Sequence, residues 1–348
     1  MIKPSAFRVV LGRAAALCVG FALVTGNAFA QSAWRDLSKH ESQLVPVDRD
    51  VTLEVLDWGW AGPATVVLLT GSGHTAHVYD DFAPKLFDCC RVYGITRRGY
   101  GASSRPASGY DDQRLANDVV AVLQRLKLAH PVLIGHSMAG GEMTTLGRQH
   151  PDLVSGLVYL DALGDLEDDP PADPEWAALA QKMPPGVRPD PVCAPQDTSS
   201  FAAYRLTQAC RRGYVVPLPE AELRQMFEVD GERVGRSRAP DWVSRAIGQG
   251  QVFRRDYSHI GVPVLALLEL PALRPTDRRP PGEADRAIVD AFVARHQVLA
   301  NRKIDKARRQ IKDFRVVDLP GAGHYIFLTR ESDVVREIHQ FIEKLSKQ

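Results

Sequence analysis

Short runs of apolar and β-branched residues alternate along the chain with longer stretches in which apolar residues recur at helical spacing. Nearly all-apolar runs are typical of strands that are buried on both faces of a sheet. The runs that predict strands are residues 51–56, 65–70, 91–96, 131–135, 156–160, 262–268 and 314–319. The stretches that predict helices between them are residues 111–128, 138–150, 285–307 and 331–347. This alternation predicts an α/β fold with a mostly parallel central sheet flanked by helices.

The alternation stops between residues 164 and 260, where the chain is rich in proline and charge. Helical patterns remain near residues 175–182, 201–210 and 219–227, but no run is typical of a parallel strand. A structureless loop of this length would be unusual in a compact domain. We therefore expect a helical cap inserted at 164–260 into a core made of residues 31–163 and 261–348.

The first thirty residues have the pattern of a secretory signal peptide. Three basic residues, Lys3, Arg8 and Arg13, precede an uncharged apolar run at 14–24, and Ala28-Phe29-Ala30 supplies small residues at the expected cleavage site. The apolar run is shorter than the ~20 residues that span a bilayer. We expect cleavage, a secreted or periplasmic protein and no stable membrane insertion; a retained N-terminal anchor is the alternative.

Composition and net charge indicate which classes of partner the protein can bind. Apolar residues make up 45% of the chain and charged residues 24%, which is ordinary for a globular protein. Without the three basic residues of the leader the formal net charge of +1 becomes −2. Such a chain lacks the basic footprint of a nucleic-acid-binding protein, and no nucleic-acid partner is expected.

Four of the five cysteines follow the leader, and export would permit disulfides among them. Cys193 and Cys210 lie in the same segment and could pair. Adjacent Cys89 and Cys90 could bridge only with strain, so we expect them to be free or to pair elsewhere. None of the cysteines has the spacing of zinc ligands, and no metal is expected.

The sharpest motif is Gly135-His136-Ser137-Met138-Ala139-Gly140-Gly141, between a predicted strand and a predicted helix. A nucleophile elbow needs small residues on either side of the serine, because the backbones approach closely at the tight turn. The turn would expose the Ser137 hydroxyl and direct the backbone N–H of Met138 toward an oxyanion. A serine that only caps the helix is the alternative.

Further motifs join this one: Leu69-Thr70-Gly71-Ser72-Gly73, Arg98-Gly99-Tyr100-Gly101-Ala102-Ser103, Val158-Tyr159-Leu160-Asp161 and Gly321-Ala322-Gly323-His324. Over nearly all of residues 50–346 the chain resembles the α/β-hydrolase superfamily, and within it the capped esterase, dehalogenase and epoxide-hydrolase-like branch. Besides Ala139, which stands where the elbow motif usually has glycine, two further positions depart from the family pattern. Thr70 replaces the usual histidine before the oxyanion loop, and Thr96 replaces the aspartate of an Asp-x-Arg-Gly turn.

His324 follows the last predicted strand on a glycine-rich loop, where the resemblance places the catalytic base. A neutral imidazole can take the serine proton and return it to the leaving group. His136 adjoins the nucleophile, so we expect its side chain to point away from Ser137 and to pack or line the pocket.

The carboxylate that should orient this imidazole is left open among three residues. Most relatives place it after the strand at 262–268, but no aspartate stands at the usual offset there. Asp161, at the end of the strand after the elbow helix, is favoured because some dehalogenase-like relatives carry the acid at that place. Asp277 and Glu269 are the alternatives.

The resemblance implies an acyl-enzyme mechanism for an ester or related acyl bond of a small-molecule substrate, with Ser137, His324 and Asp161 as the triad and no cofactor. The backbone N–H groups of Met138 and Ser72 would form the oxyanion hole. Perhydrolysis, lactone opening and C–C cleavage use a similar serine triad, and a non-catalytic ligand-binding protein is the remaining alternative. The residues that could line the pocket are His74, His77, Tyr79, Trp176, Phe201, Tyr204 and Phe227.

Overall fold

The computed structural model describes residues 34–59, 62–164, 173–183, 197–211, 217–251, 254–270 and 282–347. Contacts divide the chain into the units Met1–Arg35 and Asp36–Gln348, and the fold described below belongs to the second. The predicted leader, Cys193 and Asp277 lie outside the described residues, as does the side chain of Cys210.

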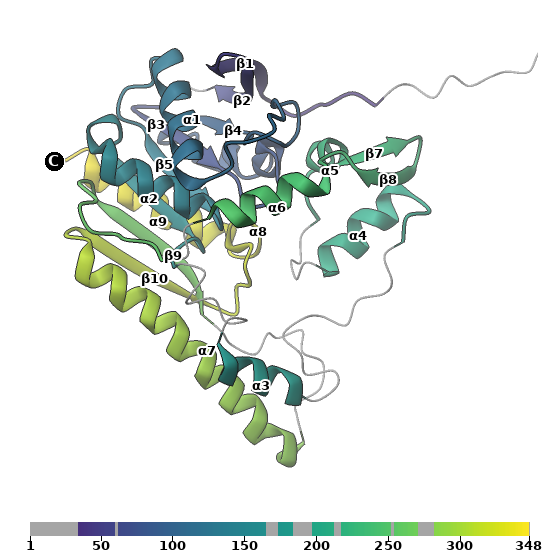
Figure 1. Cartoon of the computed structure of the whole chain (residues 1–348), viewed down its shortest axis with the longest axis vertical. Coiled ribbons are helices and arrows are strands. Elements are labelled where there is room, and N and C mark those ends of the chain that lie inside the picture. Colours follow the sequence, from purple (N-terminus) through teal and green to yellow (C-terminus); the bar gives the residue numbers. More distant parts are fainter. Residues whose placement is uncertain are drawn as a thin grey trace, which may run out of the picture. The chain divides into compact units, whose positions relative to one another are not determined.

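An eight-stranded sheet forms the centre of the second unit, in the order β1-β2-β4-β3-β5-β6-β9-β10 (Figure 1). Strand β2 pairs antiparallel with β1 and with β4, and every other neighbouring pair is parallel. The strands are β1 (Glu41–Asp48), β2 (Val51–Gly59), β3 (Ala64–Leu69), β4 (Cys90–Ile95), β5 (Val132–His136), β6 (Gly156–Leu160), β9 (Val264–Leu270) and β10 (Phe314–Pro320). The predicted α/β architecture is confirmed.

Helices cover both faces of the sheet because successive strand residues point to opposite sides. In β3, Val66 and Leu68 enter one hydrophobic cluster, while Val67 and Leu69 enter another. The first cluster includes side chains of the short helices η1 (Ala76–Tyr79), η2 (Ala83–Leu86) and α8 (Ile326–Thr329), and of α9 (Glu331–Leu345). The second includes side chains of α1 (Asp112–Arg125), α2 (Ala139–Gln149) and α7 (Glu283–Gln310). A short 3-10 helix, η3 (Pro151–Leu153), joins α2 to β6.

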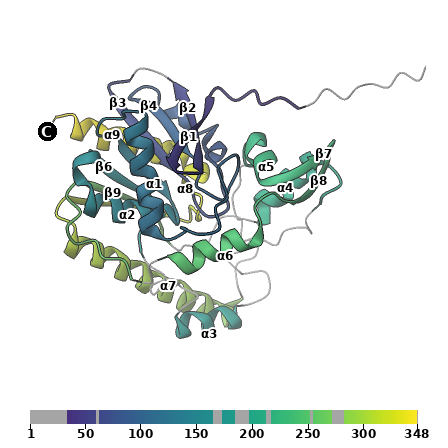
Figure 2. The same cartoon turned by 45° about the horizontal axis from the view of Figure 1, so that its top comes forward.

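In its described parts, the segment between β6 and β9 forms helices and one hairpin (Figures 1 and 2). The predicted helical pieces correspond to α3 (Pro174–Lys182), α4 (Phe201–Arg211) and α5 (Glu220–Met226). Helix α6 (Asp241–Gly250) and the antiparallel pair β7 (Phe227–Asp230) and β8 (Arg233–Ser237) were not predicted. Helix α3 packs against α7, whereas α4 contacts β8.

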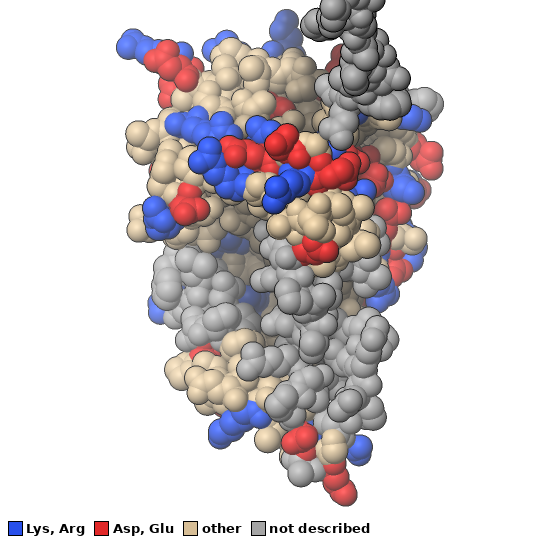
Figure 3. Space-filling view, turned by 90° about the vertical axis from the view of Figure 1, so that its right-hand side faces the viewer, with Lys and Arg blue, Asp and Glu red and all other residues tan. Residues whose placement is uncertain are grey.

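Cys89 and Cys90 form a disulfide, and our expectation that they would be free or paired elsewhere was wrong. Cys89 lies in the turn after η2 and only Cys90 belongs to β4, so the pair is not held wholly in extended strand, where successive side chains point to opposite faces. Within the described ranges, no helix combines the length and the apolarity needed to cross a membrane. On the face shown in Figure 3, basic and acidic side chains lie next to one another.

Candidate active site

Ser137 stands at a sharp turn between β5 and α2. Its φ of 57° is in the left-handed region, which non-glycine residues adopt mainly where the surrounding structure requires it. A Cβ atom on Gly135 would lie only 2.8 Å from the Cβ of Ala139, and one on Gly140 only 2.0 Å from the carbonyl oxygen of Ala162. The absence of a side chain at Gly135 leaves room for Ala139 where the family pattern usually has glycine.

The three predicted side chains Ser137, His324 and Asp161 form one hydrogen-bonded chain. The Nε2 atom of His324 lies 2.9 Å from Ser137 Oγ, and its Nδ1 atom lies 2.6 Å from Asp161 Oδ2. When Nδ1–H donates to Asp161, Nε2 is left with a lone pair directed at the serine hydroxyl. This arrangement can take a proton from Ser137 and stabilise the resulting imidazolium.

Asp161 reaches His324 because the backbone turns as soon as β6 ends. The residue has a φ of 45°, its N–H donates to Leu267 O at 2.8 Å, and its Oδ1 accepts from the N–H of Glu269 at 3.2 Å. Glu269 thus meets Asp161 through its backbone, and its side chain lines the cavity described below. The carboxylate that meets His324 Nδ1 is that of Asp161 and not that of Glu269. The other alternative, Asp277, lies outside the described residues.

The imidazole of His324 is held on a loop after β10 in which Gly321 and Gly323 have φ values of 67° and 71°. These left-handed positions favour glycine and let the loop fold back over the sheet edge. The imidazole keeps 46% of its surface exposed and the Asp161 side chain 21%. Desolvation lowers the pKa of His324, but the hydrogen bond and negative charge of Asp161 outweigh it, and the pKa is raised above 6.5.

His136 is buried and packs beneath this loop, in agreement with its predicted packing role. Its ring lies 4.5 Å from that of His324, and its Nε2–H donates to the carbonyl oxygen of His324 at 2.9 Å. Burial, together with the charge of His324, lowers the pKa of His136 well below 6.5, so the ring is neutral. Sequence reasoning missed its contact with the His324 backbone, because nothing local relates residues 136 and 324.

The loop after β3 carries Ser72, which lines the same cavity as Ser137 and Met138. Arg97 holds the start of this loop: its Nη2 donates to Thr70 O at 2.9 Å and to Glu142 of α2 at 2.7 Å. A Cβ atom on Gly71 would lie 2.7 Å from His136 Nδ1, so only glycine lets the loop pass this close to the elbow.

The far side of the loop is bound by Glu222 of helix α5. This fully buried carboxylate accepts from His74 Nδ1 at 2.7 Å and from the N–H of Thr75 at 3.1 Å, and it also accepts from the Thr75 hydroxyl. The Nε2 atom of His74 in turn accepts from the hydroxyl of Tyr325 at 2.9 Å, next to the base. The segment between β6 and β9 therefore contributes a carboxylate that fixes the loop carrying Ser72.

A cavity of about 510 Å³ opens above the three residues. Besides Ser72, Ser137, Met138, Asp161 and His324 it is lined by Ala162, Leu163, Gly164, Ser244, Ile247, Gly248, Gln251, Arg255, Leu268, Glu269, His296, Leu299, Ala300 and Lys303. Helices α6 and α7 contribute the apolar residues Ile247, Leu299 and Ala300, and Arg255 and Lys303 supply positive charge.

The residues predicted as pocket candidates do not line this cavity. His74 is engaged with Glu222 and Tyr325, and Tyr79 donates its hydroxyl to Leu69 O at 2.8 Å. Phe201 and Tyr204 are buried in the first hydrophobic cluster, against which Phe227 packs, and Trp176 packs on Phe292 of α7. His77 belongs to a group with Asp36 and His40 that has metal-binding spacing, the only such group among the described residues, and it also lies outside the cavity.

Comparison with known proteins agrees with this architecture. The Alpha/beta hydrolase family profile matches residues 66–338. The chain belongs to the α/β-hydrolase family. It is 24% identical over 307 residues to the 2-(acetamidomethylene)succinate hydrolase of Mesorhizobium japonicum, which covers 87% of this chain and 95% of that protein.

Other similarities extend over part of the chain or concern the fold alone. A fluoroacetate dehalogenase of a Burkholderia species is 32% identical over 128 residues, 35% of this chain and 41% of that protein. The crystal structure of E-2-(acetamidomethylene)succinate hydrolase superposes with a TM-score of 0.60 at 21% identity, over 87% of this chain and 99% of that one. These similarities confirm the predicted resemblance to the capped branch of the superfamily.

Proposed function

We propose that this α/β-hydrolase cleaves an ester or related acyl bond of a small molecule through an acyl-enzyme. The observation that carries the proposal is the hydrogen-bonded chain from Ser137 through His324 to Asp161, which opens onto a cavity of about 510 Å³. Cavities of this size accommodate small organic molecules. The proposed mechanism uses only groups of this chain.

In the first half of the reaction, Ser137 Oγ attacks the acyl carbon while His324 Nε2 takes the hydroxyl proton. The backbone N–H groups of Met138 and Ser72 stabilise the oxyanion, and Asp161 stabilises the imidazolium. The tetrahedral intermediate collapses when His324 gives the proton to the leaving group. Water then attacks the acyl-Ser137 ester with His324 again as base, and the acid is released.

A fluorophosphonate probe tests the nucleophile. We expect one covalent adduct on Ser137 in the folded protein, and we expect Ser137→Ala to abolish both the adduct and the hydrolysis of short p-nitrophenyl esters. The matched control is Ser72→Ala, which lines the same cavity but contributes through its backbone, and which should label within a few-fold of the parent. Folded protein that forms no adduct would instead be a non-catalytic binding protein.

Two basic side chains of the cavity favour a substrate that carries a carboxylate. Arg255 and Lys303 both line the cavity, and a guanidinium and an ammonium group can bind a carboxylate by charge-assisted hydrogen bonds. The similarity to a hydrolase named for a substituted succinate supports the same substrate class. Arg255 already donates to Ala162 O at 2.8 Å, so Lys303 is the better position for a test.

The comparison of a neutral with an anionic ester measures this preference. We expect mono-p-nitrophenyl succinate to be hydrolysed with a kcat/KM at least about tenfold above that of p-nitrophenyl butyrate, and Lys303→Met to remove most of the difference. A parent enzyme that prefers the neutral ester would refute the carboxylate preference and leave the acyl-enzyme mechanism intact.

A further inference from the structure

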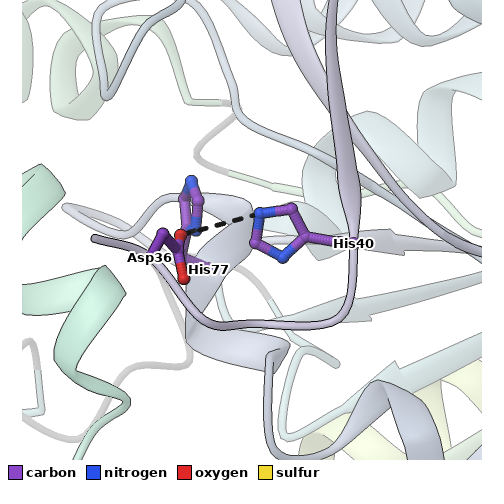
Figure 4. A group of neighbouring side chains, drawn as sticks. All are labelled: Asp36, His40 and His77. Atoms are coloured by element: carbon purple, nitrogen blue, oxygen red, sulfur yellow. Dashed lines mark ion pairs between the residues drawn. The ribbon is translucent and has the colours of Figure 1, made fainter.

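A second group of polar side chains lies apart from the catalytic cavity (Figure 4). Asp36 and His40 precede strand β1, and His77 belongs to helix η1, which follows the oxyanion loop. One ligand atom of each lies within 4.8 Å of the others. The carboxylates of Asp80 and Glu54 border the group.

His77 is the central residue, and its surroundings are unusual for a buried imidazole. Only 3% of its side chain is exposed, yet neither ring nitrogen has a hydrogen-bond partner among the described residues. Its Nδ1 atom lies 3.3 Å from Asp80 Oδ2 and 3.6 Å from Asp36 Oδ2, and its Nε2 atom lies 3.5 Å from Glu54 Oε1. Buried polar groups are normally hydrogen-bonded, so a buried imidazole that faces three carboxylates at 3.3–3.6 Å without an aligned hydrogen bond requires a reason.

The other members of the group are oriented by hydrogen bonds that leave one atom of each directed at the centre. The Nδ1–H of His40 donates to Asp80 Oδ1 at 2.8 Å, which leaves the Nε2 lone pair facing Asp36. Asp36 Oδ1 accepts from the N–H of Ser38 at 2.9 Å, which leaves Oδ2 facing both histidines. A carboxylate behind one ring nitrogen is the usual support of a metal-binding histidine.

The electrostatic field at the centre favours positive charge. Three carboxylates, those of Asp36, Asp80 and Glu54, lie within 3.6 Å of the two ring nitrogens of His77. The Nε2 lone pair of His40 faces the Asp36 carboxylate at 3.8 Å. A cation at the centre would engage both histidines and Asp36 at once.

The spacing matches that of a tetrahedral metal ion. Two ligand atoms at about 2.0–2.1 Å from Zn²⁺ lie roughly 3.4 Å apart. In the structure, Asp36 Oδ2 is 3.8 Å from His40 Nε2 and 3.6 Å from His77 Nδ1. Imidazole and carboxylate together suit Zn²⁺ better than Ca²⁺ or Mg²⁺, which prefer oxygen ligands.

We propose that Asp36, His40 and His77 form a binding site for a divalent transition-metal cation of the Zn²⁺ class, with Asp80 orienting His40. The site would join the segment before β1 to helix η1, next to the loop that carries Ser72. It is structural, because none of its residues lines the catalytic cavity. The proposal does not depend on the hydrolase mechanism.

Titration of the chelator-treated, full-length protein with metal tests the site. We expect calorimetry to detect about one Zn²⁺ per chain with a dissociation constant below about 1 μM, and Co²⁺ to give the intense visible absorption of tetrahedral coordination. Ser137→Ala should bind with the parent's affinity, because the catalytic residues are not part of the site.

The variants His77→Gln and Asp36→Asn should each weaken Zn²⁺ binding more than about 100-fold. The control is His130→Asn, which removes an exposed histidine at a φ of 46° that asparagine tolerates, and which should bind like the parent. The Asp36 side chain is 29% exposed, so this variant should fold even where the buried His77 variant does not. Parent protein that does not bind Zn²⁺, or Asp36→Asn protein that binds it with unchanged affinity, would overturn the proposal.

Discussion

Asp161→Asn is the sharpest perturbation of the proposed triad, because it changes one charge and little else. Asparagine has nearly the same volume as aspartate, and it is among the few residues that tolerate the left-handed φ of 45° at this position. Alanine would add backbone strain to the loss of the carboxylate. The asparagine variant therefore separates the chemistry from the fold.

The expected loss of activity follows from the contacts of the carboxylate. Its Oδ2 accepts the 2.6 Å hydrogen bond from His324 Nδ1, and an amide N–H at this point would favour the tautomer with its proton on Nε2, facing Ser137. Where a serine triad loses its acid in this way, kcat falls by about 10⁴. That factor corresponds to about 5.5 kcal/mol of transition-state stabilisation.

The assay is steady-state hydrolysis of a p-nitrophenyl ester, with the rate of fluorophosphonate labelling as an independent measure of Ser137 reactivity. The matched control is Glu269→Gln, which removes a second carboxylate from the same cavity and should change kcat less than about tenfold. If Asp161→Asn retained more than a tenth of the activity while Glu269→Gln lost it, Glu269 would be the acid and the reasoning from the observed hydrogen bond would be refuted.

Three further outcomes are expected. First, kcat/KM should fall at acid pH with an apparent pKa above 6.5, because the base must be neutral and Asp161 raises the pKa of His324. The variant Asp161→Asn should shift this acid-side fall in kcat/KM to lower pH. Second, His136→Phe should lower kcat by about tenfold with little change in KM, because phenylalanine keeps an aromatic ring but not the donor to the His324 carbonyl. The variant His136→Gln should recover part of this loss. Third, Glu222→Ala should lower the free energy of unfolding in urea by about 3–5 kcal/mol, since it leaves buried donors unpaired. In comparison, Glu220→Ala, which breaks an i,i+4 pair of α5 whose carboxylate is 37% exposed, should cost less than about 1 kcal/mol.

Strands buried on both sides could be predicted from the sequence, whereas the edge strand β1 and the β7–β8 hairpin could not. Strands such as β3 and β5 are almost continuously apolar, because helices cover both faces of the sheet. Strand β1 lies at the sheet edge, and of its residues only Val45 is buried, so it carries no apolar pattern. The β7–β8 hairpin was missed for the same reason.

In the candidate site too, some residues could be predicted from the sequence and others could not. The elbow motif and the glycine-rich loop indicated Ser137 and His324, because those turns need small residues at fixed offsets. Asp161 could only be favoured over two alternatives, since its place depends on a backbone turn and on the N–H of Glu269, which no side-chain pattern encodes. The catalytic roles of all three remain predictions that the proposed variants test.

Contacts between residues that are distant in the sequence could not be predicted from local sequence patterns. Asp36 and His77 are separated by forty-one positions, and His77 was expected near the pocket because it follows the oxyanion loop. The structure places it among carboxylates outside the cavity, where its contacts point to metal binding rather than to substrate.

The carboxylate of Glu222 limits how this enzyme could be re-engineered. An inserted segment of this kind would be an obvious module to exchange with that of a relative in order to change specificity. Here the segment also supplies the acceptor for Thr75 and His74, so a transplanted segment without an equivalent acid would leave the loop bearing Ser72 unsupported. A chimera would therefore have to exchange the loop at 70–75 together with α5. Substrate selectivity and catalytic activity could then be transferred only together.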